Sequence, residues 1–155
     1  MRKILVSGCL YGWLCRYDGK QIGCLDPRFL KWKEQGRLVP VCPEVFGGLP
    51  TPRPDSQRIG EKVIACTGED VTAAYEAGAR EALRLAQMHD VLFAIMKEDS
   101  PSCGSRSIYD GTFTGTKVQG EGRASQLLKE AGFRVLNETM LESAEALLAQ
   151  EDPDA

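Results

Sequence analysis

Residues 91 to 96 form an unbroken apolar run, Val-Leu-Phe-Ala-Ile-Met, in which polar and apolar side chains do not alternate. A strand with one buried face alternates, whereas a strand covered on both faces does not, and the second case is typical of parallel sheets. A segment from about 71 to 88 precedes the run and carries small and apolar residues at helical spacing. The two segments together predict a helix followed by a central parallel strand in an α/β fold.

The rest of the chain repeats this order of strand and helix. Short apolar segments at 3–8, 38–41 and 133–136 predict three further strands. Helices are expected at about 123–131 and 140–150, where apolar residues again recur at helical spacing. We therefore predict a Rossmann-like three-layer sandwich, with a mainly parallel sheet covered by helices on both faces.

Three local features refine this prediction. Asp70 is the expected N-cap of the 71–88 helix. Gly78 falls on the buried stripe of that helix, which indicates a close approach to the sheet. Residues 44–60, rich in glycine and proline, are expected to form a long irregular loop.

The length of 155 residues, with 43 % apolar composition, predicts one domain with a core of its own. We place this domain at residues 1–150 and expect the acidic segment 151–155 to fray. The net charge is −3 and the basic residues are scattered, so nucleic acid is not the expected partner.

No apolar run approaches the ~20 residues of a membrane span, so no membrane partner is expected. Ile4 to Gly8 gives an apolar core of five residues, where signal peptides need ~7 to 15. We therefore expect a cytoplasmic protein, in which thiols stay reduced.

Three cysteines, Cys9, Cys42 and Cys103, each come at or shortly after the end of a predicted strand. Because the carboxyl ends of parallel strands meet at one rim of a sheet, we expect the three thiols to converge there. A three-thiolate site suits a soft metal, and a cubane iron-sulfur cluster with one uncapped iron is the most specific version of it. The alternative is that they are small core residues, the ordinary state of free cysteine.

The other cysteines and the single histidine narrow the metal chemistry. Cys15 is a fourth ligand, a resolving thiol or a residue without a role, and the sequence does not separate these alternatives. Cys24 and Cys66 have no motif around them, and no CxxC pair occurs. His89 cannot supply a His-rich site, which favours iron and sulfur over zinc catalysis.

Several short motifs occur in order along the chain. They are Cys9-Leu-Tyr-Gly-Trp-Leu-Cys15-Arg-Tyr-Asp-Gly19, Val41-Cys-Pro-Glu44, Gly48-Leu-Pro-Thr-Pro-Arg-Pro54, Asp70-Val-Thr72, Ser100-Pro-Ser-Cys-Gly-Ser105 and Ile108-Tyr-Asp-Gly111. Together these motifs resemble the thiouracil desulfidase family, and the resemblance extends from about residue 2 to 137.

This resemblance implies a compact α/β domain with a 4Fe-4S cluster held by Cys9, Cys42 and Cys103 at the C-terminal rim of the strands. It also implies two catalytic helpers, an acid at Glu44 and a hydroxyl at Ser100. The implied reaction is a non-redox desulfuration of a thiolated nucleobase, such as 2-thiouracil to uracil and hydrosulfide. The implied partner is a small thiolated pyrimidine.

Each catalytic assignment has an alternative that the residues alone leave open. A glutamate in a glycine- and proline-rich loop is usually solvated, and a serine before proline usually forms a turn, so Glu44 and Ser100 fit both descriptions. Arg53 and Lys97 either orient an anionic or carbonyl group or, as surface basic residues more often do, face water.

Two other functions and one departure from the family pattern complete the expectations. The first alternative is a non-catalytic iron-sulfur or metal-binding carrier with a closed site. The second is a desulfurase that acts on thiolated tRNA, although the chain has no basic stripe for RNA. Asp55 stands where a further proline is expected, so we look to the loops for substrate selectivity.

Overall fold

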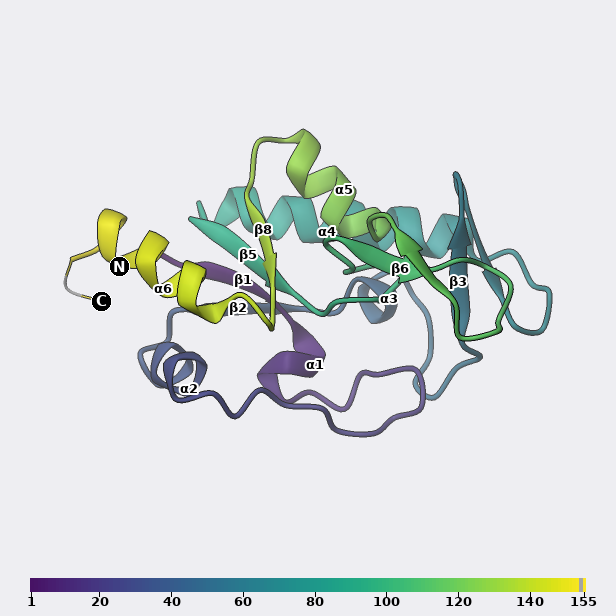
Figure 1. Ribbon diagram of the computed structural model, residues 1–155, viewed down its shortest axis with the longest axis horizontal. Coiled ribbons are helices and arrows are strands. Elements are labelled where there is room, and N and C mark those ends of the chain that lie inside the picture. The colour runs from purple at the N-terminus through teal and green to yellow at the C-terminus, as the bar shows by residue number, and fades with distance from the viewer. Residues whose placement is uncertain (154) are drawn as a thin grey trace.

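A four-stranded parallel sheet forms the centre of the computed structural model, which describes residues 1–153 and 155 (Figure 1). Its strand order is β2-β1-β5-β8, and all three pairings are parallel. The sheet therefore confirms the parallel α/β prediction. The strands are β1 (Ile4–Ser7), β2 (Leu38–Val41), β5 (Phe93–Met96) and β8 (Val135–Asn137).

Helices cover both faces of this sheet, as predicted (Figure 1). Helices α4 and α5 lie on one face, and α2 and α6 lie on the other. The helices are α1 (Gly8–Tyr11), α2 (Pro27–Glu34), α3 (Pro43–Phe46), α4 (Thr72–Met88), α5 (Arg123–Glu130) and α6 (Leu141–Glu151).

Each face of the sheet has its own apolar core, which explains the unbroken apolar run in the sequence. Ala94 and Met96 of β5 pack in the core under α4 and α5. Phe93 and Ile95, the alternate residues of the same strand, pack in the core under α2 and α6. Since burying a large apolar side chain stabilises a fold by about 1.5–3 kcal/mol, both faces of the strand favour apolar residues.

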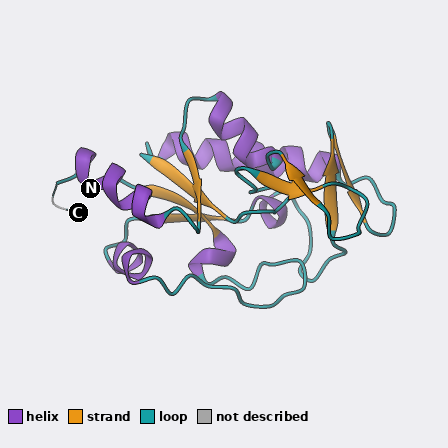
Figure 2. Cartoon of the chain, in the orientation of Figure 1, coloured by secondary structure: helices purple, strands orange, loops and turns teal. Residues whose placement is uncertain are grey.

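Two antiparallel hairpins, which the sequence analysis did not predict, lie at the end of the molecule away from the chain termini (Figure 2). The first consists of β3 (Ser56–Ile59) and β4 (Lys62–Ala65), and the second of β6 (Ser107–Tyr109) and β7 (Lys117–Gln119). Both hairpins lie beyond the carboxyl ends of the central strands, and they extend the molecule past the sheet (Figure 1).

Three further predictions need correction. The irregular loop expected at 44–60 is shorter, because α3 takes its first residues and β3 begins at Ser56. Helix α2 was missed although the sequence carries its start signal, since Asp26 accepts a hydrogen bond from the Arg28 N–H and Pro27 occupies the first turn. Asp70 is not the N-cap of α4, because the helix begins at Thr72 and its N-cap is Val71, which makes no side-chain cap hydrogen bond. Asp70 lies one residue earlier and accepts a 2.9 Å hydrogen bond from the Thr72 N–H.

The buried glycine of α4 approaches α3 and not the sheet. A Cβ on Gly78 would lie 1.7 Å from the carbonyl oxygen of Pro43, and a Cβ on Gly47 would lie 2.0 Å from the carbonyl oxygen of Ala74. The backbones of α3 and α4 are thus in direct contact through two glycines. This contact sets the position of α3, which follows Cys42 and contains Glu44.

We expect Gly78→Ala to destabilise the protein. Helix propensity alone favours alanine by about 1 kcal/mol, but the added methyl meets backbone atoms that cannot rotate away. Overpacking of this kind costs about 1–3 kcal/mol, so the free energy of unfolding falls. Urea unfolding followed by circular dichroism measures the change. A gain in stability would contradict the predicted contact, and Gly47→Ala tests the same contact from the α3 side.

Asp152 in the C-terminal segment contacts two arginines, one at the start of the chain and one just before β2. The Asp152 carboxylate accepts a 2.8 Å hydrogen bond from the buried Arg37 guanidinium and a 3.1 Å bond from the Arg2 N–H. The division into a 1–150 domain and a frayed 151–155 segment stays a prediction. Among the described residues, no helix is long and apolar enough to cross a membrane.

Candidate active site

The three predicted cysteine ligands follow three adjacent strands of the sheet. Cys9 lies in α1 directly after β1, Cys42 directly follows β2, and Cys103 lies in the loop after β5. Ligands of open α/β sheets bind outside the carboxyl ends of the strands, where the strand order changes direction. In the order β2-β1-β5-β8 that point lies between β1 and β5, which places the cysteines around it.

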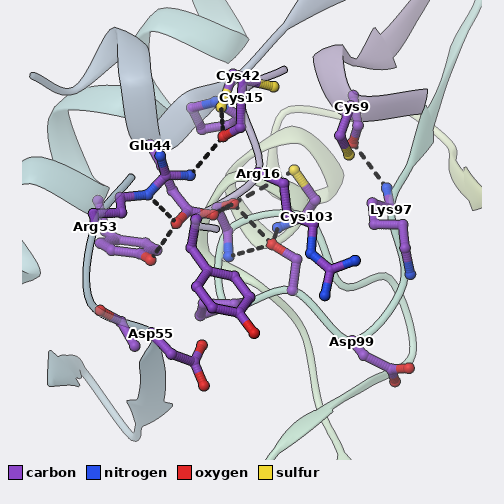
Figure 3. Close-up of a pocket in the computed structure, with 18 of the residues that line it drawn as sticks. Cys9, Cys15, Arg16, Cys42, Glu44, Arg53, Asp55, Lys97, Asp99 and Cys103 are labelled. Atoms are coloured by element: carbon purple, nitrogen blue, oxygen red, sulfur yellow. Dashed lines mark hydrogen bonds and ion pairs between the residues drawn. The ribbon is translucent and has the colours of Figure 1, made fainter. Parts of the chain in front are cut away.

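A cavity of about 460 Å³ opens at this rim, and all five predicted site residues line it. The structure thus brings Cys9, Cys42, Cys103, Glu44 and Ser100 together. Figure 3 shows Cys15 beside Cys42, while Cys9 lies on the other side next to Lys97.

A one-turn helix determines where Cys9 lies. The Gly12 and Trp13 N–H groups both bond to the Gly8 carbonyl oxygen, so α1 ends after a single turn. Gly12 has a φ of 115°, a left-handed conformation that glycine adopts without a Cβ penalty. Cys9 is thereby held at the end of β1 with its thiol at the cavity.

The thiols differ in acidity because their surroundings differ. Burial raises the pKa of Cys9 and of Cys103 to about 12. Cys42 has the opposite shift, since the neighbouring Cys15 thiol lowers its pKa. The same interaction raises the pKa of Cys15. Because metals bind thiolates, occupation of this site by a metal centre releases protons.

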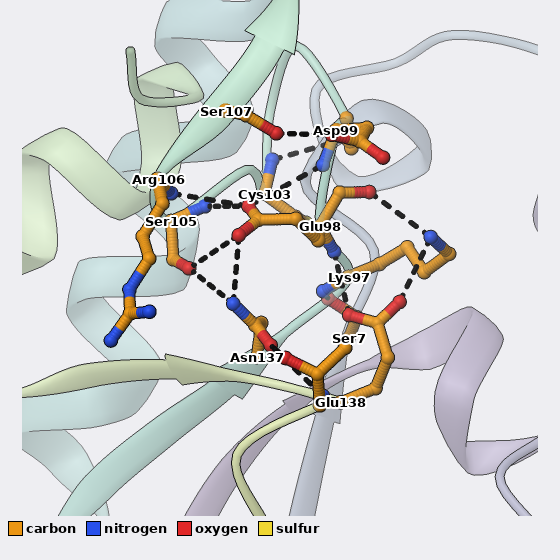
Figure 4. Close-up of polar contacts among 12 residues, drawn as sticks. Ser7, Lys97, Glu98, Asp99, Cys103, Ser105, Arg106, Ser107, Asn137 and Glu138 are labelled. Carbon is orange, nitrogen blue, oxygen red and sulfur yellow. Dashed lines mark hydrogen bonds and ion pairs between the residues drawn. The ribbon is translucent and has the colours of Figure 1, made fainter. Parts of the chain in front are cut away.

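The loop that carries Cys103 is built around the Glu98 carboxylate (Figure 4). Glu98 accepts hydrogen bonds from the Ser105 N–H at 2.6 Å, the Arg106 N–H at 3.1 Å and the Asn137 amide at 2.7 Å. The start of α5 holds the other side, where the Ser125 hydroxyl donates to the Cys103 carbonyl at 2.7 Å. These hydrogen bonds therefore fix the backbone of Cys103, the cysteine predicted to bind the cluster.

Glu44 lies at the cavity with both carboxylate oxygens occupied. Oε1 accepts hydrogen bonds from the Tyr75 hydroxyl at 2.7 Å and the Arg53 guanidinium at 3.1 Å. Oε2 accepts one from the Ser102 hydroxyl at 2.9 Å. Contact with Glu44 raises the pKa of Tyr75, in addition to the larger effect of burial. Glu44 is thus a positioned carboxylate and not a solvated loop residue.

Ser102 connects the two predicted catalytic residues. Its Oγ lies 2.9 Å from the Ser100 Oγ and 3.5 Å from the Cys103 Sγ. A carboxylate can only accept hydrogen bonds, so the Ser102 hydroxyl donates to Glu44 and accepts a hydrogen bond from the Ser100 hydroxyl. The Ser100 oxygen in turn accepts from the N–H groups of Ser102 and Cys103. The order of donation therefore runs from Ser100 through Ser102 to Glu44.

The two basic residues weighed in the sequence analysis have structural partners. The Arg53 side chain is buried and also donates to the carbonyl oxygen of Cys15 at 2.9 Å, so it does not face water. The Lys97 ammonium forms a 2.9 Å ion pair with Glu138. Arg53 thus orients Glu44 and the Cys15 backbone.

Three cysteines that line one cavity suit a cluster, because a cubane has several iron atoms to bind. Four ligands of one zinc ion lie about 3.8 Å apart, given Zn–S bonds of about 2.3 Å. Within residues 1–153 and 155, no three Cys, His, Asp or Glu side chains are grouped closely enough for one metal ion. In a cubane each thiolate binds a different iron, which suits three thiols spread around one cavity.

Comparison with known proteins identifies the family. The sequence profile of the 2-thiouracil desulfurase family matches residues 4–140, which is most of the chain. The chain belongs to the 2-thiouracil desulfurase family. The resemblance found in the sequence motifs is thereby confirmed.

Two relatives of this 2-thiouracil desulfurase family member extend the match to nearly the full length. A solved structure described as a [4Fe-4S]-dependent thiouracil desulfidase, TudS, has a TM-score of 0.95 and 43 % sequence identity. The match covers 97 % of this chain and 99 % of that chain. The uncharacterized protein YbbK of Bacillus subtilis (strain 168) is 41 % identical over 148 residues, covering 89 % of this chain and 97 % of that protein.

The sequence analysis missed the contacts that two cavity residues of this family member make with Glu44. Ser102 was visible in the Ser-Pro-Ser-Cys motif, but nothing in the sequence said that its hydroxyl connects Ser100 to Glu44. Tyr75 lies within the helix expected at 71–88, and periodicity does not reveal that its hydroxyl meets a carboxylate. Both contacts join segments that are far apart in the chain.

Proposed function

We propose that this protein removes the sulfur of 2-thiouracil hydrolytically, with a 4Fe-4S cluster bound by Cys9, Cys42 and Cys103. Membership of the 2-thiouracil desulfurase family and the similarity to a [4Fe-4S]-dependent thiouracil desulfidase support the cofactor and the substrate. The observation that carries the proposal is that three thiols at the ends of adjacent strands share one cavity with the Glu44 carboxylate.

The reaction needs no external electrons. Water supplies the oxygen of the product, the C–S bond of the thiocarbonyl breaks, a C–O bond forms, and sulfur leaves as hydrosulfide. A 4Fe-4S cluster held by three cysteines supplies an iron with an open coordination position, a soft Lewis acid for a thiocarbonyl sulfur.

The protein's own groups manage the protons. Arg53 and Tyr75 hold one oxygen of Glu44, so its carboxylate keeps a fixed orientation at the cavity. In this position Glu44 acts as the base that accepts a proton from the attacking water. Ser100 donates toward Glu44 through Ser102, and this order allows the hydroxyl pair to carry a proton between the carboxylate and the substrate.

We further propose that the substrate is a free pyrimidine handled in the cytoplasm. A cavity of about 460 Å³ has the size range of small-ligand pockets. The net charge of −3, without a basic stripe, does not favour an RNA backbone. The cytoplasm keeps the thiols reduced, as a thiolate-bound cluster requires.

Anaerobic reconstitution with iron and sulfide, followed by incubation with 2-thiouracil, tests the proposal. We expect a brown protein that releases hydrosulfide and uracil in equal amounts. If metal-free protein converted 2-thiouracil at the rate of the reconstituted protein, the cluster mechanism would be contradicted. That result would indicate chemistry by a cysteine persulfide.

Replacing Cys15 separates an open catalytic site from a closed carrier site. A carrier with four protein ligands needs one more thiolate, and Cys15 is the thiol that contacts Cys42. We expect Cys15→Ala to retain the iron content and visible absorption of the unmodified protein, because three cysteines suffice. Iron analysis makes the measurement, with Cys24→Ala as the matched control. Loss of iron in Cys15→Ala alone would support the carrier.

A further inference from the structure

Aromatic side chains stand in the cavity wall, and the proposed chemistry does not use them. Tyr17 comes from the segment after α1, Tyr109 ends β6, and Phe113 lies in the turn between β6 and β7. Tyr17 and Phe113 are each 37 % exposed, whereas Cys42 and Cys103 are buried. Tyr17 and Phe113 are therefore more accessible to solvent than Cys42 and Cys103.

Phe113 has an unusual backbone conformation for a bulky residue. Its φ is 58°, in the left-handed region that such residues rarely adopt. Conformations of this kind persist only where the surrounding structure imposes them, and they concentrate at ligand sites. The turn around Phe113 is accordingly held by side chains, since the Asp110 carboxylate accepts from the Thr112 N–H at 2.9 Å.

Gln57 fixes this turn from the other hairpin. Its Oε1 accepts hydrogen bonds from the Gly111 N–H at 2.8 Å and from the Phe113 N–H at 3.2 Å. Gln57 lies in β3 and is only 5 % exposed, so its carboxamide is held by the packing around it. The two hairpins are thus joined by one side chain, and that bond holds the Phe113 backbone beside the cavity.

We propose that Phe113 forms the face on which the pyrimidine ring stacks, and that Gln57 is the residue that positions it. This inference rests on the proposed function. When the thiocarbonyl end points to the cysteines, the flat ring extends toward the cavity mouth, where Phe113 lies. A planar heteroaromatic ring gains affinity by stacking on an aromatic side chain, with a change of about 10-fold on removal of the contact.

The substrate class follows from this geometry. Stacking recognises a flat ring and does not depend on the substituents at the edge of the ring. The aromatic residues of the cavity therefore select thiolated heteroaromatic rings over open-chain thioamides. The groups proposed to act on the sulfur-bearing carbon, Glu44 and Ser100, line the same cavity. Selectivity for the ring and chemistry at the sulfur therefore belong to different parts of the protein, the hairpins and the sheet rim.

Steady-state kinetics with 2-thiouracil test the proposal through the division between KM and kcat. We expect Phe113→Ala to raise KM about 10-fold with kcat changed less than about 2-fold, and Phe113→Tyr to restore KM. Gln57→Leu, which keeps the volume but removes the acceptor, is expected to raise KM in the same direction. Val118→Ala on β7 is the control, because Val118 is exposed and lies outside the cavity.

Calorimetric titration with uracil gives a readout that does not depend on turnover. Uracil has the same ring without the sulfur, and we expect Phe113→Ala to weaken its binding by a similar factor. If the wild-type protein is active, the proposed function stands. An unchanged KM in Phe113→Ala, or a loss of kcat alone, would then overturn the inference about stacking. If the wild-type protein does not convert 2-thiouracil, the proposed function fails, and equal uracil affinities would then overturn the inference as well.

Discussion

Replacing Cys103 by alanine is expected to abolish both iron binding and desulfuration. Its sulfur is one of three proposed ligands, and two thiolates cannot hold a cubane against loss of iron. The side chain is 4 % exposed and packs in the core under α4 and α5, so the substitution removes one small atom from the fold. After anaerobic reconstitution, iron content is expected to fall below about a tenth of that of the unmodified protein.

Cys66→Ala is the matched control for this prediction. Cys66 is an exposed cysteine that does not line the cavity, so its replacement leaves iron content and activity unchanged. Circular dichroism of the metal-free Cys103→Ala protein separates loss of the ligand from loss of the fold. A folded Cys103→Ala protein that retains full iron content and turnover would refute the proposed ligand set.

Glu44→Gln is expected to lower kcat by about 100- to 10,000-fold while the iron content stays unchanged. Loss of a positioned general base has effects of this size. Glutamine has the shape of glutamate and keeps an acceptor for Arg53 and Tyr75, while its NH2 group no longer accepts the hydrogen bond from Ser102. Its amide, however, cannot take a proton from water. Single-turnover measurement of hydrosulfide release on reconstituted protein gives the rate of the chemical step.

The corresponding change at Glu76 controls for the removal of a partly buried charge. Glu76 forms a 2.6 Å ion pair with Arg123 outside the cavity, and Glu76→Gln is expected to affect stability without lowering kcat. If Glu44→Gln turned over at the rate of Glu76→Gln, Glu44 would be a structural residue and the base would lie elsewhere.

Much of the central sheet was visible in the sequence. The runs at 38–41 and 91–96 are buried on both faces, and this burial forces the apolar composition from which the strands were predicted. The hairpin at 107–119 was missed for the same physical reason. Its two strands have three residues each, 117–119 is exposed throughout and only Ile108 of 107–109 is buried, so their composition carries little of the apolar signal.

The five proposed site residues were named from strand ends and family motifs, and all five line one cavity. Their connections were not predictable. Ser102 contacts Glu44 across 58 positions of sequence, and Gln57 contacts Phe113 across 56. No local pattern records such pairs, because each hydrogen bond depends on where the whole fold places two separate loops.

The amino-acid sequence by itself determined the fold class, the α/β order of elements and the thiols at the strand ends, since these follow from local apolar periodicity and chain direction. Only the tertiary structure decided that Glu44 is held by Arg53 and Tyr75, that Gly78 meets α3, and that residues of two hairpins line the cavity. The physical reason is that the burial of a strand determines the apolar character of its own consecutive residues. Hydrogen bonds and backbone contacts between distant segments, in contrast, exist only after the layers have packed.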